Sequence, residues 1–115
     1  MENVATKGRQ SPVVHLEDAP VPQTLYMIVE HFKGGDPPPV YQRFRDRGRM
    51  APEGLNYISS WVDHDLTTCY QVMRTADRGL LELWMANWND LVDFEVHPVI
   101  TSAEAAELVA SQRST

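Results

Sequence analysis

The order in which extended and helical patterns alternate along the chain most constrains its fold. Four runs rich in β-branched and aromatic residues predict strands: residues 24–32, 55–63, 67–74 and 91–100. Two intervening stretches, residues 37–50 and 77–88, instead place apolar side chains at helical spacing. The sequence therefore predicts the order strand, helix, strand, strand, helix, strand.

This order is the split βαβ pattern, βαββαβ, of a ferredoxin-like α+β fold. In that fold one four-stranded antiparallel sheet carries both helices on one face, and the first and third strands are central. A further short helix is predicted after the fourth strand. Thr101 or Ser102 is placed to cap this helix, and Glu104 is placed for a capping box behind Thr101.

A chain of 115 residues is long enough for one such domain and too short for two. We place the domain at residues 24–112. Residues 1–23 are mostly polar and are interrupted by prolines, so we expect them to form a disordered tail. Val13, Val14 and Leu16 leave a short docked strand as the alternative.

The net charge of the chain limits its expected binding partners, and its cysteine content indicates the cellular compartment. The net charge of −6 argues against nucleic acid or an anionic membrane as the main partner, because both require a basic face. No apolar run approaches the roughly 20 residues of a membrane span, and the N-terminus lacks the apolar stretch of a signal peptide. Cys69 is the single cysteine and has no intramolecular disulfide partner, so we expect a reducing cytoplasm.

Side chains alternate between the two faces of a strand, so each predicted strand divides into two sets. We expect the more aliphatic set, which includes Leu25, Met27 and Val29, to lie under the helices, with Phe44, Leu81, Trp84 and Trp88 packed on it. The other set mixes aromatic, sulfur-containing, aliphatic and acidic groups: Tyr26, Ile28, Glu30, Tyr57, Ser59, Trp61, Cys69, Gln71, Met73, Asp93, Glu95 and His97. Such a face needs a cover, and we expect a second copy to supply it under twofold symmetry. The result is a barrel-like homodimer with a partly polar lumen.

Three titratable residues are the candidate catalytic group. Glu30, Glu95 and His97 are predicted to point into the lumen together, where carboxylates and a histidine serve as acids or bases. The remaining candidates are a ligand-binding wall: Tyr26, Tyr57, Ser59, Trp61 and Cys69. A dimer-interface network of satisfied polar groups is the alternative interpretation. No H-x-H, H-x-x-x-H or C-x-x-C spacing is present, so we expect no metal site and no cofactor.

Four arginines alternate along the first predicted helix: Arg43, Arg45, Arg47 and Arg49. Because successive members are two residues apart, they spread over two faces and form no single basic stripe. We interpret them as a solvated helix face, with an anion contact near Arg47 to Arg49 as the alternative. The chain has neither a G-x-S-x-G motif nor a phosphate-binding glycine loop.

Three segments resemble an uncharacterised bacterial family of small domains, the domain of unknown function DUF3303. They are LYMIVEHF, VYQRFRDRGRMAPEGLNYISSWV and LVDFEVHPVITSAEAA, and the resemblance covers about residues 24–107. It implies a dimeric α+β barrel and brings no established activity. Proteins of similar fold include cofactor-independent monooxygenases, haem-degrading, dismutase-like and dehalogenase-type enzymes, and regulatory ligand-binding domains, so the fold alone does not define the chemistry.

Three functions fit these observations. The first is a dimer that binds a small molecule in its lumen without catalysis. The second is a cofactor-independent enzyme, monooxygenase- or isomerase-like, with Glu30, Glu95 or His97 as the base. The third is a structural dimer whose lumen is filled by its own side chains. We rank ligand binding first.

Overall fold

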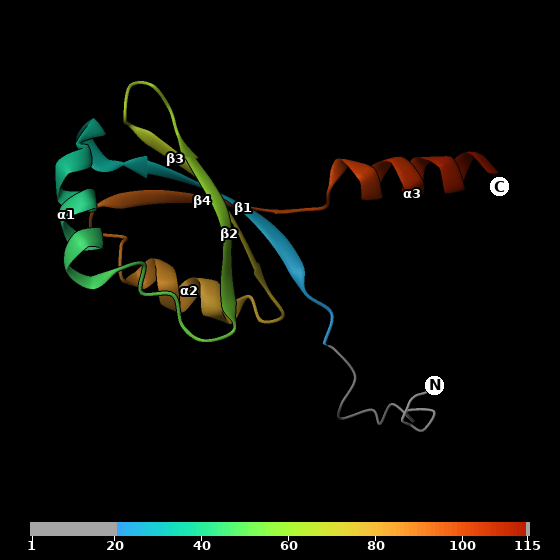
Figure 1. The fold of residues 1–115 in the computed structure, drawn as a ribbon, viewed down its shortest axis with the longest axis horizontal. Helices are drawn as coiled ribbons and strands as arrows, with labels where there is room; N and C mark the ends of the chain where they lie inside the picture. Colours follow the sequence, from blue (N-terminus) through green and yellow to red (C-terminus); the bar gives the residue numbers. More distant parts are fainter. Residues whose placement is uncertain (1–20, 115) are drawn as a thin grey trace.

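The computed structural model describes residues 21–114, so most of the expected tail lies outside the described residues. Figure 1 shows a twisted sheet with helices packed on one side, while the C-terminal helix extends away from it. The elements follow in chain order: β1 (Thr24–Phe32), the 3₁₀ turn η2 (Lys33–Gly35), α1 (Pro37–Arg47), β2 (Leu55–Val62), β3 (Thr68–Thr75), α2 (Gly79–Ala86), β4 (Val92–Val99) and α3 (Ser102–Ser114).

The fold is α+β, with a four-stranded antiparallel sheet in the order β2-β3-β1-β4 within the described residues. The central positions of β1 and β3 are as predicted. The predicted strands are present, and their ends differ from the prediction by at most one residue. Alternating β-branched and aromatic residues therefore located the strands reliably.

The two central helices are shorter at their C-terminal ends than predicted. Helix α1 ends at Arg47 because Gly48 adopts a φ of 70° while its N–H donates to the Phe44 carbonyl at 2.8 Å. Helix α2 ends at Ala86 rather than near residue 88. Just before α2, the Asp77 carboxylate accepts a hydrogen bond from the Gly79 N–H at 2.8 Å, while the N-cap of the helix is Arg78.

The prediction of which β1 residues face the helices is wrong. Tyr26, Ile28 and Glu30 are buried under α1 and α2, whereas Leu25 and Met27 lie on the opposite, helix-free face. The same reversal holds for β3, where these residues are buried: Cys69, Gln71, Met73 and Thr75. Both sets of β1 are apolar, so alternation alone did not distinguish the covered face from the open one.

A β-bulge in β2 separates residues that the alternation placed together. The register with β3 shifts between Tyr57 and Ser59, so Tyr57 pairs with Met73 and Ser59 pairs with Val72. Tyr57 therefore belongs to the helix-covered face, while Ser59 belongs to the helix-free face. The predicted common face for Tyr57, Ser59 and Trp61 is wrong for this reason.

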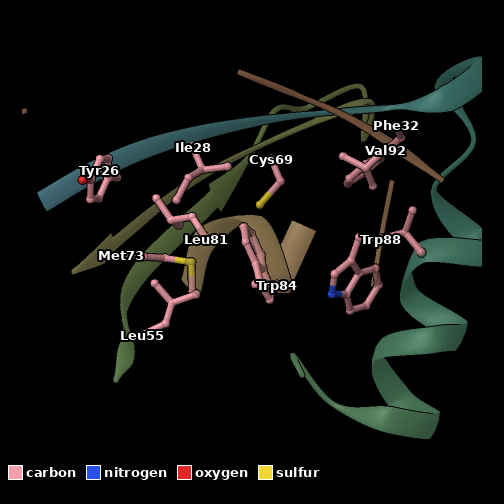
Figure 2. Packing of buried hydrophobic residues seen from close by; sticks show 11 residues of the cluster. Tyr26, Ile28, Phe32, Leu55, Cys69, Met73, Leu81, Trp84, Trp88 and Val92 are labelled. Atoms are coloured by element: carbon pink, nitrogen blue, oxygen red, sulfur yellow. The ribbon is translucent and has the colours of Figure 1, made fainter. Parts of the chain in front are cut away.

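The core lies between the sheet and α2, with α1 closing one end (Figure 2). Leu81, Trp84 and Trp88 are buried there, as their helical spacing predicted. Burial of each such side chain stabilises the fold by about 1.5–3 kcal/mol. Phe44, also expected in this layer, is 42% exposed and lies instead at the wall of a cavity.

Helix α3 begins with the predicted capping box. The Thr101 N–H donates to Glu104 Oε1 at 2.9 Å, and the Glu104 N–H donates to Thr101 Oγ1 at 3.0 Å. Figure 1 shows α3 extending away from the sheet, and Leu108 and Val109 are more than half exposed. Among the described residues, no helix has the length and apolar character needed to cross a membrane.

Candidate functional site

A cavity of about 260 Å³ lies between the helix-covered face of the sheet and the helices. Its apolar wall consists of Phe32, Val40, Tyr41, Phe44, Val62, Trp84 and Trp88. Its polar or titratable groups are Glu30, Arg49, Ser60, Cys69 and Gln71. A mostly apolar, concave lining with a few convergent polar groups is typical of a small-molecule site.

Glu30 is the buried acid of this cavity. The side chain comes from central strand β1, and the residue is 9% exposed. Its Oε2 is buried and has no hydrogen-bond partner among the described residues. Burial raises the pKa of Glu30 to about 7, and the positive charge of Arg49 partly opposes this rise. Near neutral pH the carboxyl group is therefore able to donate or to accept a hydrogen bond.

Cys69 pairs with Glu30 across β1 and β3 and also lines the cavity. Figure 2 shows its side chain pointing from the sheet toward Trp84 of α2. Burial, together with the nearby Glu30, raises the pKa of the Cys69 thiol to about 12. The group is thus a protonated, weakly polar part of the wall at neutral pH, and it lacks the thiolate that nucleophilic catalysis requires.

The segment after α1 holds Arg49 at the cavity. The indole N–H groups of Trp84 and Trp88 both donate to the Arg49 carbonyl oxygen at 3.0 Å. The Arg49 guanidinium carbon lies 3.7 Å from the centre of the Tyr57 ring and 5.3 Å from that of Phe44. Two tryptophans therefore fix the backbone, and two aromatic rings contact the side chain.

Two other polar groups of the cavity are already paired. Ser60 Oγ lies 2.7 Å from the Tyr57 hydroxyl, and Gln71 Nε2 donates to Met73 Sδ at 3.3 Å. Tyr41 lines the cavity nearby, and its pKa is raised by burial and by the proximity of Cys69 and Glu30. Glu30 and Arg49 thus remain the groups with the most unused hydrogen-bonding capacity.

The predicted grouping of Glu30 with Glu95 and His97 is wrong. In the β1–β4 register Glu30 pairs with Phe94, while Glu95 pairs with Val29, so Glu95 and His97 lie on the helix-free face. The prediction failed because it assigned β1 the wrong face. A catalytic role for either group stays a prediction.

Glu95 instead interacts with two histidines on the helix-free face. Its carboxylate lies 2.6 Å from His31 Nε2 and 3.3 Å from His97 Nε2, and these hydrogen bonds lower the pKa of Glu95. All three side chains are about half exposed. No cluster of His, Cys, Asp or Glu within residues 21–114 is arranged to hold a metal ion.

The predicted ligand wall divides between the two faces. Cys69 lines the cavity, and Tyr26 is buried on the same face without lining it. Tyr57 lies against Arg49, whereas Ser59 and Trp61 belong to the helix-free face. Binding roles for these residues also stay predictions.

Sequence reasoning missed several residues of the cavity. Trp84 and Trp88 were assigned to the core alone, although their indole N–H groups hold the Arg49 backbone. Gln71 was placed on the same predicted face as Glu30 and Cys69 but was not selected as a binding residue, and Tyr41 was not selected either. The alternative of an anion contact near Arg47 to Arg49 was the one indication in the sequence of a site at this end of the cavity.

The fold and the cavity define a small α+β protein with a candidate ligand site between its sheet and helices. Residues 24–113 match the family model described as a domain of unknown function, DUF3303, and the chain belongs to this family. Neither the curated proteins nor the solved structures contain a significant match to the chain.

Proposed function

We propose that the protein binds a small, ring-bearing molecule in the cavity between its sheet and helices. The observation that carries this proposal is the Glu30 carboxyl group, which is buried at the cavity with Oε2 unpaired among the described residues. Buried polar groups are nearly always hydrogen-bonded, so an orphan of this kind requires an explanation. A ligand with one polar group directed at Glu30 supplies the missing partner.

The size and lining of the cavity define the ligand class. A cavity of about 150 Å³ accommodates benzene, so about 260 Å³ suits one ring with a short substituent. Trp84 and Trp88 contribute aromatic surface against which such a ring packs. The cavity is formed by one chain, so binding does not require a second copy.

Acid–base catalysis on the bound molecule is the second candidate function. The specific observation in its favour is the burial of the Glu30 carboxyl group at the cavity wall, which raises the pKa of Glu30 to about 7. A general base or acid is most effective when its pKa lies near the working pH. Under this proposal the protein is a cofactor-independent enzyme, of monooxygenase or isomerase type, and Glu30→Gln retains binding but loses turnover.

We also propose that the protein is a homodimer whose helix-free sheet faces meet, as in a dimeric α+β barrel of ferredoxin-like units. The strand order supports the ferredoxin-like unit of this proposal, because β1 and β3 are the two central strands. Half-buried Met27, Val29 and Val72 lie on that face, beside the exposed ring of Trp61. A second copy would remove this apolar surface from water.

Ligand-observed NMR with three single-ring probes tests the binding proposal. The probes are phenylacetamide, phenylacetate and phenethylamine, which are neutral, anionic and cationic. Val62→Phe narrows the cavity, so it should weaken the binding of any probe that the wild type binds. Ser59→Phe, the control on the same strand but the other face, should leave binding unchanged. If no probe binds, or if Ser59→Phe abolishes binding while Val62→Phe does not, the proposed site is wrong.

A further inference from the structure

Arg49 differs from three other arginines of the described chain in having no polar partner. Arg43 forms two hydrogen bonds of 2.7 Å to Asp90, Arg45 donates to Gln42, and Arg78 lies 3.9 Å from Glu82. The Arg49 guanidinium makes no hydrogen bond or ion pair with any residue in the range 21–114. It is nevertheless half-buried at the cavity of a protein with a net charge of −6.

The backbone around Arg49 is held in an unusual conformation. Gly48 has a φ of 70°, and Met50, which carries a side chain, has a φ of 61°. Left-handed backbone at a residue such as Met50 is unfavourable and persists where surrounding contacts enforce it. The two indole N–H groups of Trp84 and Trp88 on the Arg49 carbonyl are such contacts. Arg49 is therefore positioned by bonds that do not involve its charge.

The aromatic contacts of Arg49 leave its charged edge available. The guanidinium lies over the Tyr57 ring at 3.7 Å, a distance that indicates contact with the face of the ring. Contact through the plane of a guanidinium does not use the N–H groups at its edge, and these match the two oxygens of a carboxylate. The arrangement thus prepares a cation for a planar anion.

We propose that Arg49 binds the carboxylate of the cavity's ligand, and that the ligand is an arylalkanoic or aromatic carboxylic acid. This inference rests on the proposed ligand-binding function and adds the ligand's charge. The ring of the ligand packs among Phe44, Trp84 and Trp88, which line the same cavity as Arg49. Glu30, in its protonated form, donates a hydrogen bond to a polar atom of the ligand.

The opposite assignment is that Arg49 serves only as the counter-ion of an ionised Glu30. In that case the paired site as a whole is neutral and gives an anionic ligand no advantage. A cationic ligand that competes with Arg49 for Glu30 would even be preferred. The charge preference of the cavity therefore distinguishes the two assignments without any mutation.

Isothermal titration calorimetry at pH 6 with phenylacetate, phenylacetamide and phenethylamine measures this preference. We expect wild-type protein to bind phenylacetate at least about tenfold more tightly than the uncharged phenylacetamide, as a charge-assisted pair requires. Arg49→Gln should remove this advantage and leave phenylacetamide binding unchanged, because the tryptophan bonds involve only the Arg49 backbone. Arg49→Lys should retain part of the affinity advantage of phenylacetate over phenylacetamide. Arg47→Gln removes a positive charge at an exposed position of α1 and should leave the affinities for all three compounds unchanged.

The outcomes separate this inference from the proposed function. If phenylacetamide or phenethylamine binds as tightly as phenylacetate, the cavity is a ligand site but the role of Arg49 is wrong. If Arg47→Gln lowers phenylacetate affinity as much as Arg49→Gln does, the effect is general electrostatics and the role of Arg49 is again wrong. If none of the three compounds binds, both the inference and the proposed function fail.

Discussion

Glu30 is the residue whose ionisation most directly links the cavity to the stability of the fold. Its pKa is about 7 in the folded protein, against an ordinary value of 4.5, and burial is the main cause. Because the folded pKa is higher, the folded state binds more protons than the unfolded state between these two values. Stability therefore falls as the pH rises from about 4.5 through 7, and it levels off once Glu30 is fully ionised in the folded protein.

Urea unfolding at pH 5 and pH 8 tests this linkage. The ionisation of Glu30 should lower the free energy of unfolding by about 3 kcal/mol across the full transition. Glu30→Gln has no charge to bury, so its free energy of unfolding should change much less between the two pH values. An equal pH dependence in the wild type and the variant would show that Glu30 ionises freely in the folded protein.

The reactivity of the Cys69 thiol tests independently whether the cavity wall beside Glu30 is buried. Its thiol pKa rises from 9.0 to about 12, which reduces the thiolate fraction at pH 8 by about a thousandfold. Alkylation by iodoacetamide should accordingly be slower by about that factor in the folded protein than in urea. Rapid alkylation without denaturant would contradict the placement of Cys69 inside the cavity wall.

At the scale of the element, the start of β2 depends on a close contact with α2. Gly54 has a φ of 96°, and a Cβ atom there would lie 2.9 Å from Leu80 Cδ1. Gly34, with a φ of 66°, is the matched position, because a Cβ there meets no heavy atom of the described chain within 4 Å. Both glycines adopt left-handed backbone, but of the two only Gly54 also leaves room for a neighbouring side chain, that of Leu80.

Substitution of each glycine by alanine separates strain from steric overlap. Gly34→Ala should destabilise the protein by about 1 kcal/mol through backbone strain alone. Gly54→Ala should cost about 2 kcal/mol, because the Leu80 side chain must also move. Urea unfolding measures both values, and an equal loss in the two variants would exclude a tight contact between the β2 turn and α2.

The elements also show how far the sequence predicts this fold. Period-two runs of β-branched and aromatic residues located the strands, and the spacing around Trp84 and Trp88 located α2. The choice of face in β1 failed because Tyr26 and Ile28 alternate with equally apolar Met27 and Val29. Tertiary packing decides between two such sets, and alternation does not contain that information.

The candidate site was only partly predictable for related reasons. Glu30 and Cys69 were selected as titratable or sulfur-containing residues on one face, and that shared face is present. The bulge in β2 moved Tyr57 away from Ser59 and Trp61, because one extra residue reverses the alternation beyond it. Arg49 owes its position to hydrogen bonds from Trp84 and Trp88, which lie far along the chain, so no local pattern records them.

At the scale of the whole molecule, we expect the two sheet faces to have separate roles. The helix-covered face contains the cavity, and the helix-free face is the proposed surface for a second copy. Because the cavity lies within one chain, loss of the dimer should leave ligand binding intact. Binding and association are therefore expected to respond to different substitutions.

Sedimentation equilibrium at micromolar concentration tests the proposed dimer. The wild type should have twice the mass of one chain, and Val72→Glu should be a monomer because it places a charge at the centre of the helix-free face. Leu83→Glu introduces the same charge at an exposed position of α2 and should remain a dimer. A monomeric wild type, or a dimeric Val72→Glu variant, would contradict association through this face.

The indole N–H signals of the three tryptophans report directly on where a ligand is bound. Trp84 and Trp88 line the cavity, while Trp61 lies on the helix-free face. The measurement is a ¹H–¹⁵N correlation spectrum recorded during titration with phenylacetate and with phenylacetamide. We predict that the Trp84 and Trp88 signals shift with saturation while the Trp61 signal stays in place. Movement of the Trp61 signal alone would place the ligand on the helix-free face of the sheet and contradict binding in the cavity.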